Sequence, residues 1–154
     1  LKLNLARNKL RSVTENFFKM TNMSRLEELV LDRNPLSFTD SYYSIFDGLE
    51  ASLKSVYLSN LNPVVPSVIS KKTLMNSLNR LKKLEILKLN NNNYDLDETE
   101  NETIHHDLIE LNLPDLQVLE MANNNLVKLP NFLCNLKSLK SLDLSSNYLT
   151  SPFS

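Results

Sequence analysis

The stretch LEILKLNNNNYDL, residues 84–96, decides which fold the sequence predicts. Leucines stand at positions 84, 87 and 89, and four asparagines follow directly. An amphipathic helix would repeat apolar residues three and four apart without a polar tract, and a half-buried strand would alternate for longer. The stretch fits neither pattern alone, so its meaning depends on the rest of the chain.

The same phrase recurs six times along the chain. The shared frame is L-x-x-L-x-L-x-x-N-x-L, and its copies begin about 23 to 32 residues apart. They lie near residues 1–10, 26–36, 53–63, 84–94, 116–126 and 139–149. The asparagine of the frame is Asn8, Asn34, Asn92, Asn124 and Asn147, with Leu61 in the third copy. Such a period indicates a repeat architecture.

At these phrases the chain resembles the leucine-rich repeat family, and the resemblance covers essentially all of it. It implies an α/β solenoid, with a curved parallel β-sheet on the concave face and helices, 3-10 turns and loops on the convex face. Residues 1–154 are then one leucine-rich-repeat domain fragment of about six repeats. In the family the repeated asparagines stack as a ladder, which makes them structural residues.

Each phrase predicts a short strand followed by a bend. In the fourth copy Leu87 and Leu89 face the core, Ile86 and Lys88 face outward, and Asn92 bonds main-chain groups left unpaired by the bend. Because Leu61 replaces asparagine, we expect a distorted third bend, partly compensated by Asn60 or Asn62. The strands are expected near residues 3–5, 29–31, 56–58, 87–89, 119–121 and 142–144.

The segments between the phrases differ in length and style. Each of these segments returns along the convex side to the next strand. In the segment after the first phrase, the residues expected to face the core are Val13, Phe17 or Phe18, Met20 and Met23. In the compact segment after the fifth phrase, they are Leu129, Phe132, Leu133 and Leu136. The stretch 70–84 has Leu74, Leu78 and Leu81 at helical spacing, which predicts a convex helix. The acidic stretch after residue 94 predicts a surface loop that becomes amphipathic only from residue 104.

Composition restricts the functional classes. With 17 Lys+Arg against 18 Asp+Glu, the chain offers no global field for nucleic acid or an anionic membrane, so neither partner is expected within these residues. No apolar run is long enough to span a bilayer. Only one glycine is present, so asparagine is the expected residue at tight bends.

The sequence gives little for catalysis, and we predict that the chain is not an enzyme and uses no cofactor or metal. Gly48 alone cannot form a phosphate loop. His105 and His106 are adjacent and would diverge by about 100 degrees on a helix, and the acidic residues 95–102 lack a calcium-loop spacing. The single cysteine, Cys134, excludes an internal disulfide and is expected to be a buried, inert thiol.

Two N-glycosylation acceptor phrases occur, at Asn22 and Asn101. Both are expected on the convex or loop side, where a sugar could fit. Chance alone supplies such phrases in a chain rich in asparagine, serine and threonine, so only their placement is informative.

Ligand binding in a solenoid usually uses the outward strand residues of the concave face. The candidate ligand-binding residues are Val30, Arg33, Tyr57, Ile86, Lys88 and Glu120. Tyr57 is the best candidate anchor, because aromatic residues dominate interface hot spots. The mixed charges along this face argue against a nucleic-acid groove.

The first phrase starts at Leu1 in mid-pattern and the last stops at LTSPFS, which is expected of a slice of a longer solenoid. Irregular repeat lengths resemble Toll-like and related adhesion receptors, which implies a recognition module of a cell-surface or secreted receptor for a protein or peptide ligand. Homo- or hetero-dimerisation through a parent ectodomain is compatible with that role. The alternative is a cytoplasmic scaffold or regulatory subunit, favoured by the compact repeat 129–147 and the unpaired cysteine.

Overall fold

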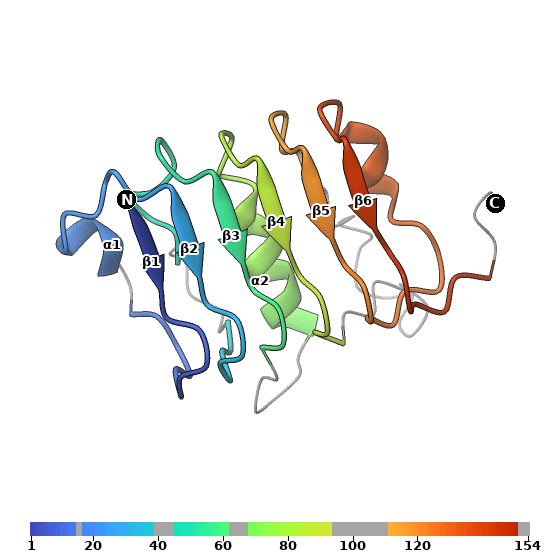
Figure 1. Cartoon of the computed structure of the whole chain (residues 1–154), viewed down its shortest axis with the longest axis horizontal. Coiled ribbons are helices and arrows are strands. Elements are labelled where there is room, and N and C mark those ends of the chain that lie inside the picture. The colour runs from blue at the N-terminus through green and yellow to red at the C-terminus, as the bar shows by residue number, and fades with distance from the viewer. Residues whose placement is uncertain (15–16, 39–44, 62–67, 94–110, 151–154) are drawn as a thin grey trace.

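The computed structural model describes residues 1–14, 17–38, 45–61, 68–93 and 111–150. Six three-residue strands form one sheet in chain order, and every neighbouring pair is parallel (Figure 1). The strands are β1 Lys2–Asn4, β2 Glu28–Val30, β3 Ser55–Tyr57, β4 Ile86–Lys88, β5 Val118–Glu120 and β6 Ser141–Asp143. The predicted α/β leucine-rich-repeat solenoid is confirmed.

Each strand begins and ends one residue earlier than predicted. The second leucine of the L-x-L pattern already belongs to the bend, because its carbonyl accepts a side-chain amide instead of a strand N–H. Asn34 Nδ2, for example, donates to the carbonyl oxygens of Leu5 and Leu31, both at 2.9 Å. The asparagine therefore ends the strand as well as supporting the turn.

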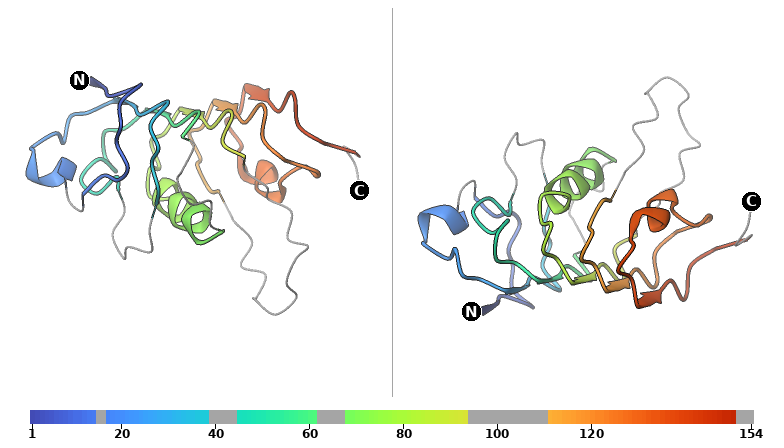
Figure 2. Two further views of the ribbon diagram at one scale, coloured as in Figure 1. Left: turned by 90° about the horizontal axis from the view of Figure 1, so that it is seen from below. Right: turned by 90° about the horizontal axis from the view of Figure 1, so that it is seen from above.

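The core lies between the sheet and the return segments behind it (Figure 2). The central strand residues Leu29, Val56, Leu87 and Leu119 are in register and fully buried. The return side carries α1 Phe17–Met20, α2 Val68–Leu78 and the 3-10 helix η1 Asn131–Asn135. None of the helices in the described part of the chain is long and apolar enough to cross a membrane.

The predicted convex helix is present as α2. Leu74, Met75 and Leu78 are buried against the core, as the helical spacing indicates. The helix ends at Leu78, earlier than predicted, and Leu81 reaches the core from the following turn, where its N–H donates to the Leu78 carbonyl at 2.9 Å. The acidic stretch and both histidines lie outside the described residues.

Two residues expected to be inward are exposed. Met20 is 81% exposed, because it lies two residues after the buried Phe18 on the single turn of α1 and so faces the opposite side. Cys134 has the same relation to the buried Phe132 on η1 and is an exposed free thiol. The prediction that the Cys134 side chain is buried is therefore wrong.

The asparagine ladder is confirmed by its hydrogen bonds. Asn92 Nδ2 donates to the carbonyls of Leu58 at 2.6 Å and Leu89 at 3.0 Å, and its Oδ1 accepts the N–H of Leu61 at 2.8 Å. Asn124 and Asn147 bond in the same way one and two repeats further on. Each amide ties its own strand to the preceding one.

The prediction of a distorted third bend is wrong. Asn60 has a φ of 56°, the same left-handed value as the equivalent residue of every other repeat, and the N–H of Leu61 is held by Asn92. The left-handed residues at this position of the six repeats are Arg7, Arg33, Asn60, Asn91, Asn123 and Ser146. Asn62 lies outside the described residues. Asparagine, which tolerates this conformation well, fills three of these six positions, and arginine or serine fills the other three.

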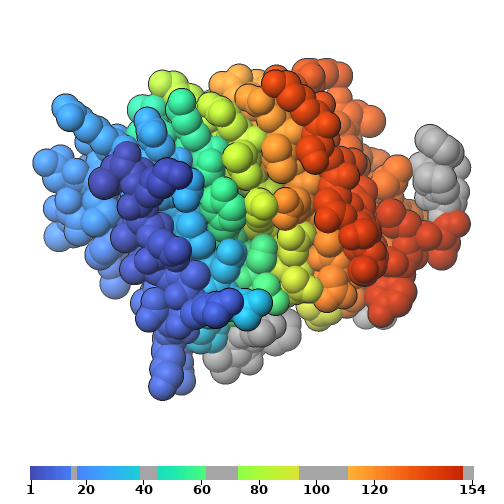
Figure 3. Space-filling model, in the orientation of Figure 1, coloured from blue at the N-terminus to red at the C-terminus, as the bar shows by residue number. Residues whose placement is uncertain are grey.

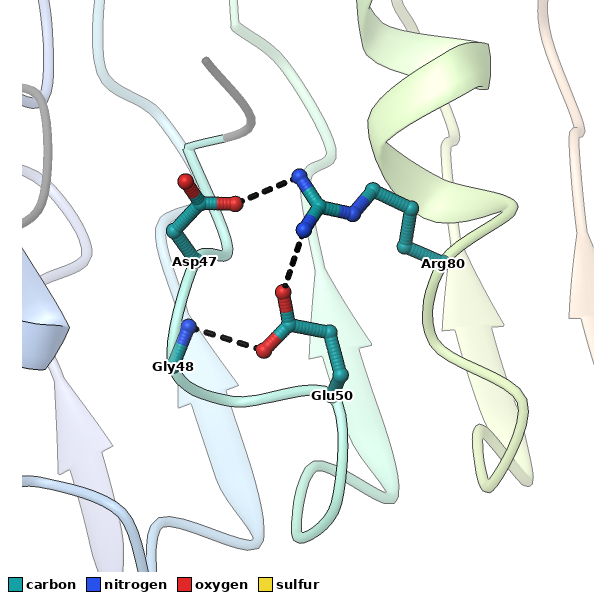
Figure 4. Close-up of polar contacts among 4 residues, drawn as sticks. All are labelled: Asp47, Gly48, Glu50 and Arg80. Atoms are coloured by element: carbon teal, nitrogen blue, oxygen red, sulfur yellow. Dashed lines mark hydrogen bonds and ion pairs between the residues drawn. The ribbon is translucent and has the colours of Figure 1, made fainter.

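A polar clasp joins the second and third repeats behind the sheet (Figure 4). Arg80 donates to Asp47 at 2.6 Å and to Glu50 at 2.9 Å, and the N–H of Gly48 donates to Glu50 at 2.8 Å. Gly48 has a φ of +91°, and a Cβ added there would lie 3.1 Å from the Cα of Lys19 in α1. The only glycine thus stands where the second repeat lies close against α1 of the first repeat.

Candidate functional site

The outward residues of the six strands form one continuous surface, termed here the strand face, which is the face predicted to be concave. Figure 3 shows the molecule in the orientation of Figure 1, with the strands toward the viewer and the repeats as successive bands of colour. The parallel register aligns the outward residues in rows across the repeats. The central row is Asn4, Val30, Tyr57, Lys88, Glu120 and Asp143.

An apolar band crosses the middle of the strand face. It consists of Val30, Tyr57, Ile86 and Val118, each half-buried. Val30 is paired with Tyr57 across β2 and β3, and Ile86 with Val118 across β4 and β5. Ile86 is the register partner of Ser55, on the same strand as Tyr57, so the band continues diagonally. Outward apolar side chains therefore lie on four adjacent strands.

Lys88 is fixed in place beside the apolar band. Its Nζ forms an ion pair with Glu120 Oε1 at 2.7 Å and lies 5.5 Å from the centroid of the Tyr57 ring. The hydrogen bond to Glu120 raises the pKa of Lys88 above its usual value. Because both side chains are about one-quarter to one-third exposed, the pair is accessible yet already ordered.

A second polar row lies just beyond the strand ends. Asp32 Oδ1 accepts the N–H of Ser59 at 2.6 Å, and Ser59 Oγ accepts the N–H of Asn90 at 3.1 Å. Asn90 Nδ2 donates to Glu120 Oε2 at 2.8 Å, and Asn90 Oδ1 accepts the N–H of Ala122 at 2.7 Å. This chain of bonds runs from the second repeat to the fifth and connects with the Lys88–Glu120 pair.

Five of the six predicted binding residues come together. Val30, Tyr57, Ile86, Lys88 and Glu120 occupy two adjacent rows of β2 to β5. Arg33 does not join them on the strands, because it is the exposed left-handed residue of the bend, with a φ of 57°. It lies at the rim of the strand face.

Sequence reasoning missed Asp32, Ser59 and Asn90. Their signal was present, because outward positions alternate and Asp32 follows Val30 by two residues. The asparagine-rich bend obscured the pattern, because the sequence predicted this outward row one residue later, at Arg33, Asn60 and Asn91. The structure shows that the bonded outward surface extends one step past the strands.

The other predicted positions lie apart from the strand face. Asn22 is an exposed residue in the turn after α1, with a φ of 56°, so its side chain is accessible to solvent. Asn101 lies outside the described residues. No group of three potential metal ligands occurs among the residues that the structure describes.

A hollow of about 470 Å³ lies where the chain enters β4 to β6. Its lining includes Glu85, Asp115, Lys137 and Lys140. Lys137 Nζ donates to the Cys134 carbonyl at 2.8 Å, and Lys140 Nζ donates to Gln117 Oε1 at 2.9 Å. Both lysines are thus engaged by the protein itself, and the strand face remains the better candidate site.

Comparison with known proteins agrees with this architecture. A family model described as Leucine Rich Repeat matches residues 115–136 and 138–154. Seventeen chains of solved structures are similar, among them a leucine-rich-repeat protein of Leptospira interrogans, with a TM-score of 0.61 and 28% sequence identity. That likeness covers 99% of this chain and 32% of the Leptospira chain, so this chain spans about a third of its length. No curated protein matches.

Proposed function

We propose that residues 1–154 form one leucine-rich-repeat domain of about six repeats that binds a protein or peptide ligand on the strand face. Leucine-rich-repeat proteins generally mediate protein–protein interaction, and this chain has their fold. The observation that carries the proposal is the apolar band of Val30, Tyr57, Ile86 and Val118, bordered by the ordered Lys88–Glu120 pair. An apolar centre with a polar rim is the usual anatomy of a protein interface.

The charges of the strand face favour a protein over a nucleic acid. Lys2 pairs with Glu28 at 3.0 Å and Lys88 pairs with Glu120 at 2.7 Å, so positive and negative groups alternate. Phosphate backbones bind surfaces on which lysines and arginines cluster with one sign. A polypeptide with its own mixture of apolar and charged side chains fits this surface better.

For the parent protein we favour a cell-surface or secreted receptor or adhesion role of the Toll-like kind. The exposed acceptor phrase at Asn22 supports it, as do the irregular repeat lengths. The second candidate is an intracellular scaffold, and the exposed free thiol of Cys134 favours it, because unpaired exposed cysteines are better tolerated in reducing compartments. Labelling intact cells that produce the parent protein with a membrane-impermeant maleimide tests these alternatives, since only a surface Cys134 reacts before lysis.

The binding proposal is tested with a displayed library of random 12-residue peptides, selected on the purified chain. Truncation of Tyr57 to alanine removes the aromatic anchor and should weaken the selected peptides by about 30-fold. Tyr148→Ala is the matched control, because Tyr148 is 67% exposed and lies outside the apolar band. Peptides that bind Tyr57→Ala, Lys88→Ala and Glu120→Ala as well as the wild type would contradict the proposal.

The acidic stretch needs its own arm in this experiment. Asp97→Asn and Glu100→Gln should change mainly the association rate and its salt dependence. If these two variants abolish binding while the three strand-face variants do not, the site belongs to the acidic stretch.

A further inference from the structure

Asp32 differs from the other carboxylates of the strand face. Glu28 and Glu120 are each neutralised by a lysine, at 3.0 and 2.7 Å. Asp143 lies on the end strand β6, and its Oδ1 accepts the N–H of Ser145 at 2.9 Å. Asp32 is half-buried, and no described residue forms an ion pair with it. Its neighbour Lys88 is already held by Glu120.

The folded protein supplies Asp32 with one backbone hydrogen bond. Oδ1 accepts the Ser59 N–H at 2.6 Å, which leaves the lone pairs of Oδ2 for another donor. Burial raises the pKa of the Asp32 carboxyl, and this effect outweighs the opposing hydrogen bond and the attraction of Lys88 and Arg33. The charged form of Asp32 therefore destabilises the folded protein. A residue that served only to stabilise the fold would not be expected to have this effect.

The position of Asp32 relates it to the apolar band. It follows Val30 by two residues on the same face, and its bond to Ser59 places it at the end of the strand that carries Tyr57. A side chain that reaches Asp32 from above the sheet would therefore come from a segment already in contact with Val30 and Tyr57.

We propose that Asp32 pairs with a lysine or arginine of the bound protein or peptide, next to an apolar residue that packs on Val30 and Tyr57. This inference rests on the proposed function of the strand face and adds the chemistry of the partner to it. The cation neutralises a carboxylate that has no ion-pair partner among the described residues. A charge-assisted hydrogen bond of this kind is among the stronger contacts in an interface.

The test uses the same 12-residue library, selected in parallel on the wild type and on Asp32→Asn. Asparagine keeps the shape and the acceptor for the Ser59 N–H but removes the charge. Wild-type peptides should be enriched in a lysine or arginine beside an apolar residue, and Asp32→Asn should weaken them by about tenfold or more. Asp143→Asn removes one negative charge elsewhere on the face and should change affinity by less than about twofold.

A double-mutant cycle then assigns the contact. Replacing the basic residue of a selected peptide by methionine should weaken binding to the wild type by about tenfold and leave binding to Asp32→Asn unchanged. Equal losses on both proteins, or equal enrichment of basic residues in both selections, overturn the pairing. If the Asp32 pairing fails but Tyr57→Ala still weakens peptide binding, the proposed binding function of the strand face is retained without the pairing. A selection that yields no binder dependent on Tyr57 overturns the proposed function and the pairing together.

Discussion

At the scale of the residue, the ladder asparagines serve two repeats each. Asn92 donates to Leu58 of the third repeat and to Leu89 of its own, and Asn124 donates to Leu89 again. The carbonyls of Leu5, Leu89 and Met121 each accept one amide from their own repeat and one from the next repeat. This redundancy explains why Leu61 can replace an asparagine without disturbing its bend, because Asn92 still bonds the Leu58 carbonyl and the Leu61 N–H.

Truncation of a central ladder residue should nevertheless be costly. We expect Asn92→Ala to lower the free energy of unfolding by about 1 to 3 kcal/mol, because it leaves buried main-chain groups with fewer partners. Asn8→Ala is the matched control: Asn8 is exposed and its amide bonds only carbonyls of its own repeat, those of Leu5 and Ala6. Urea denaturation of both variants measures the difference, and equal stability of Asn92→Ala and the wild type would remove the structural interpretation of the ladder.

Removal of the Asp32 charge, in contrast to truncation of Asn92, should not destabilise the folded protein at neutral pH. Its folded-state pKa is raised above the ordinary 3.8, so the folded protein holds the proton more tightly than the unfolded chain. The associated stabilisation is fully present below pH 3.8 and is lost as the pH rises through the raised value. At pH 7 Asp32→Asn should therefore be at least as stable as the wild type, with the difference shrinking toward pH 4.

Asp143→Asn provides the control of opposite sign. Hydrogen bonds from Ser145 hold the pKa of Asp143 below its usual value, so its charged form is favoured by folding. The variant should lose stability at pH 7 if it changes at all. The free energies of unfolding of the wild type and both variants, measured at pH 7 and pH 4, test these two expectations. An Asp32→Asn protein that is clearly less stable than the wild type at pH 7 would contradict the stability effect inferred for Asp32.

At the scale of the element, the return segments are joined by contacts that the repeat pattern does not contain. Gly48 approaches the backbone of Lys19 in α1 and has a left-handed φ of +91°. Gly48→Ala should lower the free energy of unfolding by about 1 to 3 kcal/mol, because the added Cβ meets backbone and the conformation is strained. Arg80→Ala, which opens the half-exposed clasp of Figure 4, should cost less than about 1 kcal/mol. Scanning calorimetry of the two variants compares them, and a larger loss for Arg80→Ala would reverse this ranking.

The sequence predicted the long elements better than the short ones. The spacing of Leu74 and Leu78 was sufficient for α2, because three helical turns average out a single misplaced residue. The single turns α1 and η1 leave no such margin, and there the sequence placed Met20 and Cys134 on the wrong side. A period of 3.6 residues cannot be measured from four or five positions.

At the scale of the whole molecule, the candidate site could be predicted because the repeat fixes the register. Once the phrases are aligned, Tyr57 and Lys88 must be neighbours on adjacent strands, and they are register partners. The Lys88–Glu120 ion pair and the hydrogen bond between Asp32 and Ser59 could not be predicted from the sequence. They depend on side-chain conformations and on how far the outward face extends into the bends.

Stability should be distributed unevenly along the stack of repeats. Repeats contact mainly their neighbours, so a central strand is supported on both sides and an end strand on one. Leu142 of β6 is 42% exposed, whereas its register equivalents Leu119 and Leu87 are fully buried. Native-state hydrogen exchange of this chain should therefore be slowest in the middle of the sheet.

The amides of Leu58 and Leu89, which donate to the next strand at 2.9 and 2.7 Å, should exchange most slowly. The Leu5 amide makes the equivalent bond to Val30 at 2.8 Å but should exchange faster, because the first strand opens by local fraying without global unfolding. The comparison is matched, since all three amides occupy the same position of the phrase and make the same bond. Equal protection at Leu5, Leu58 and Leu89 would mean that the sheet opens only as a unit, and the nearest-neighbour account of its stability would be wrong.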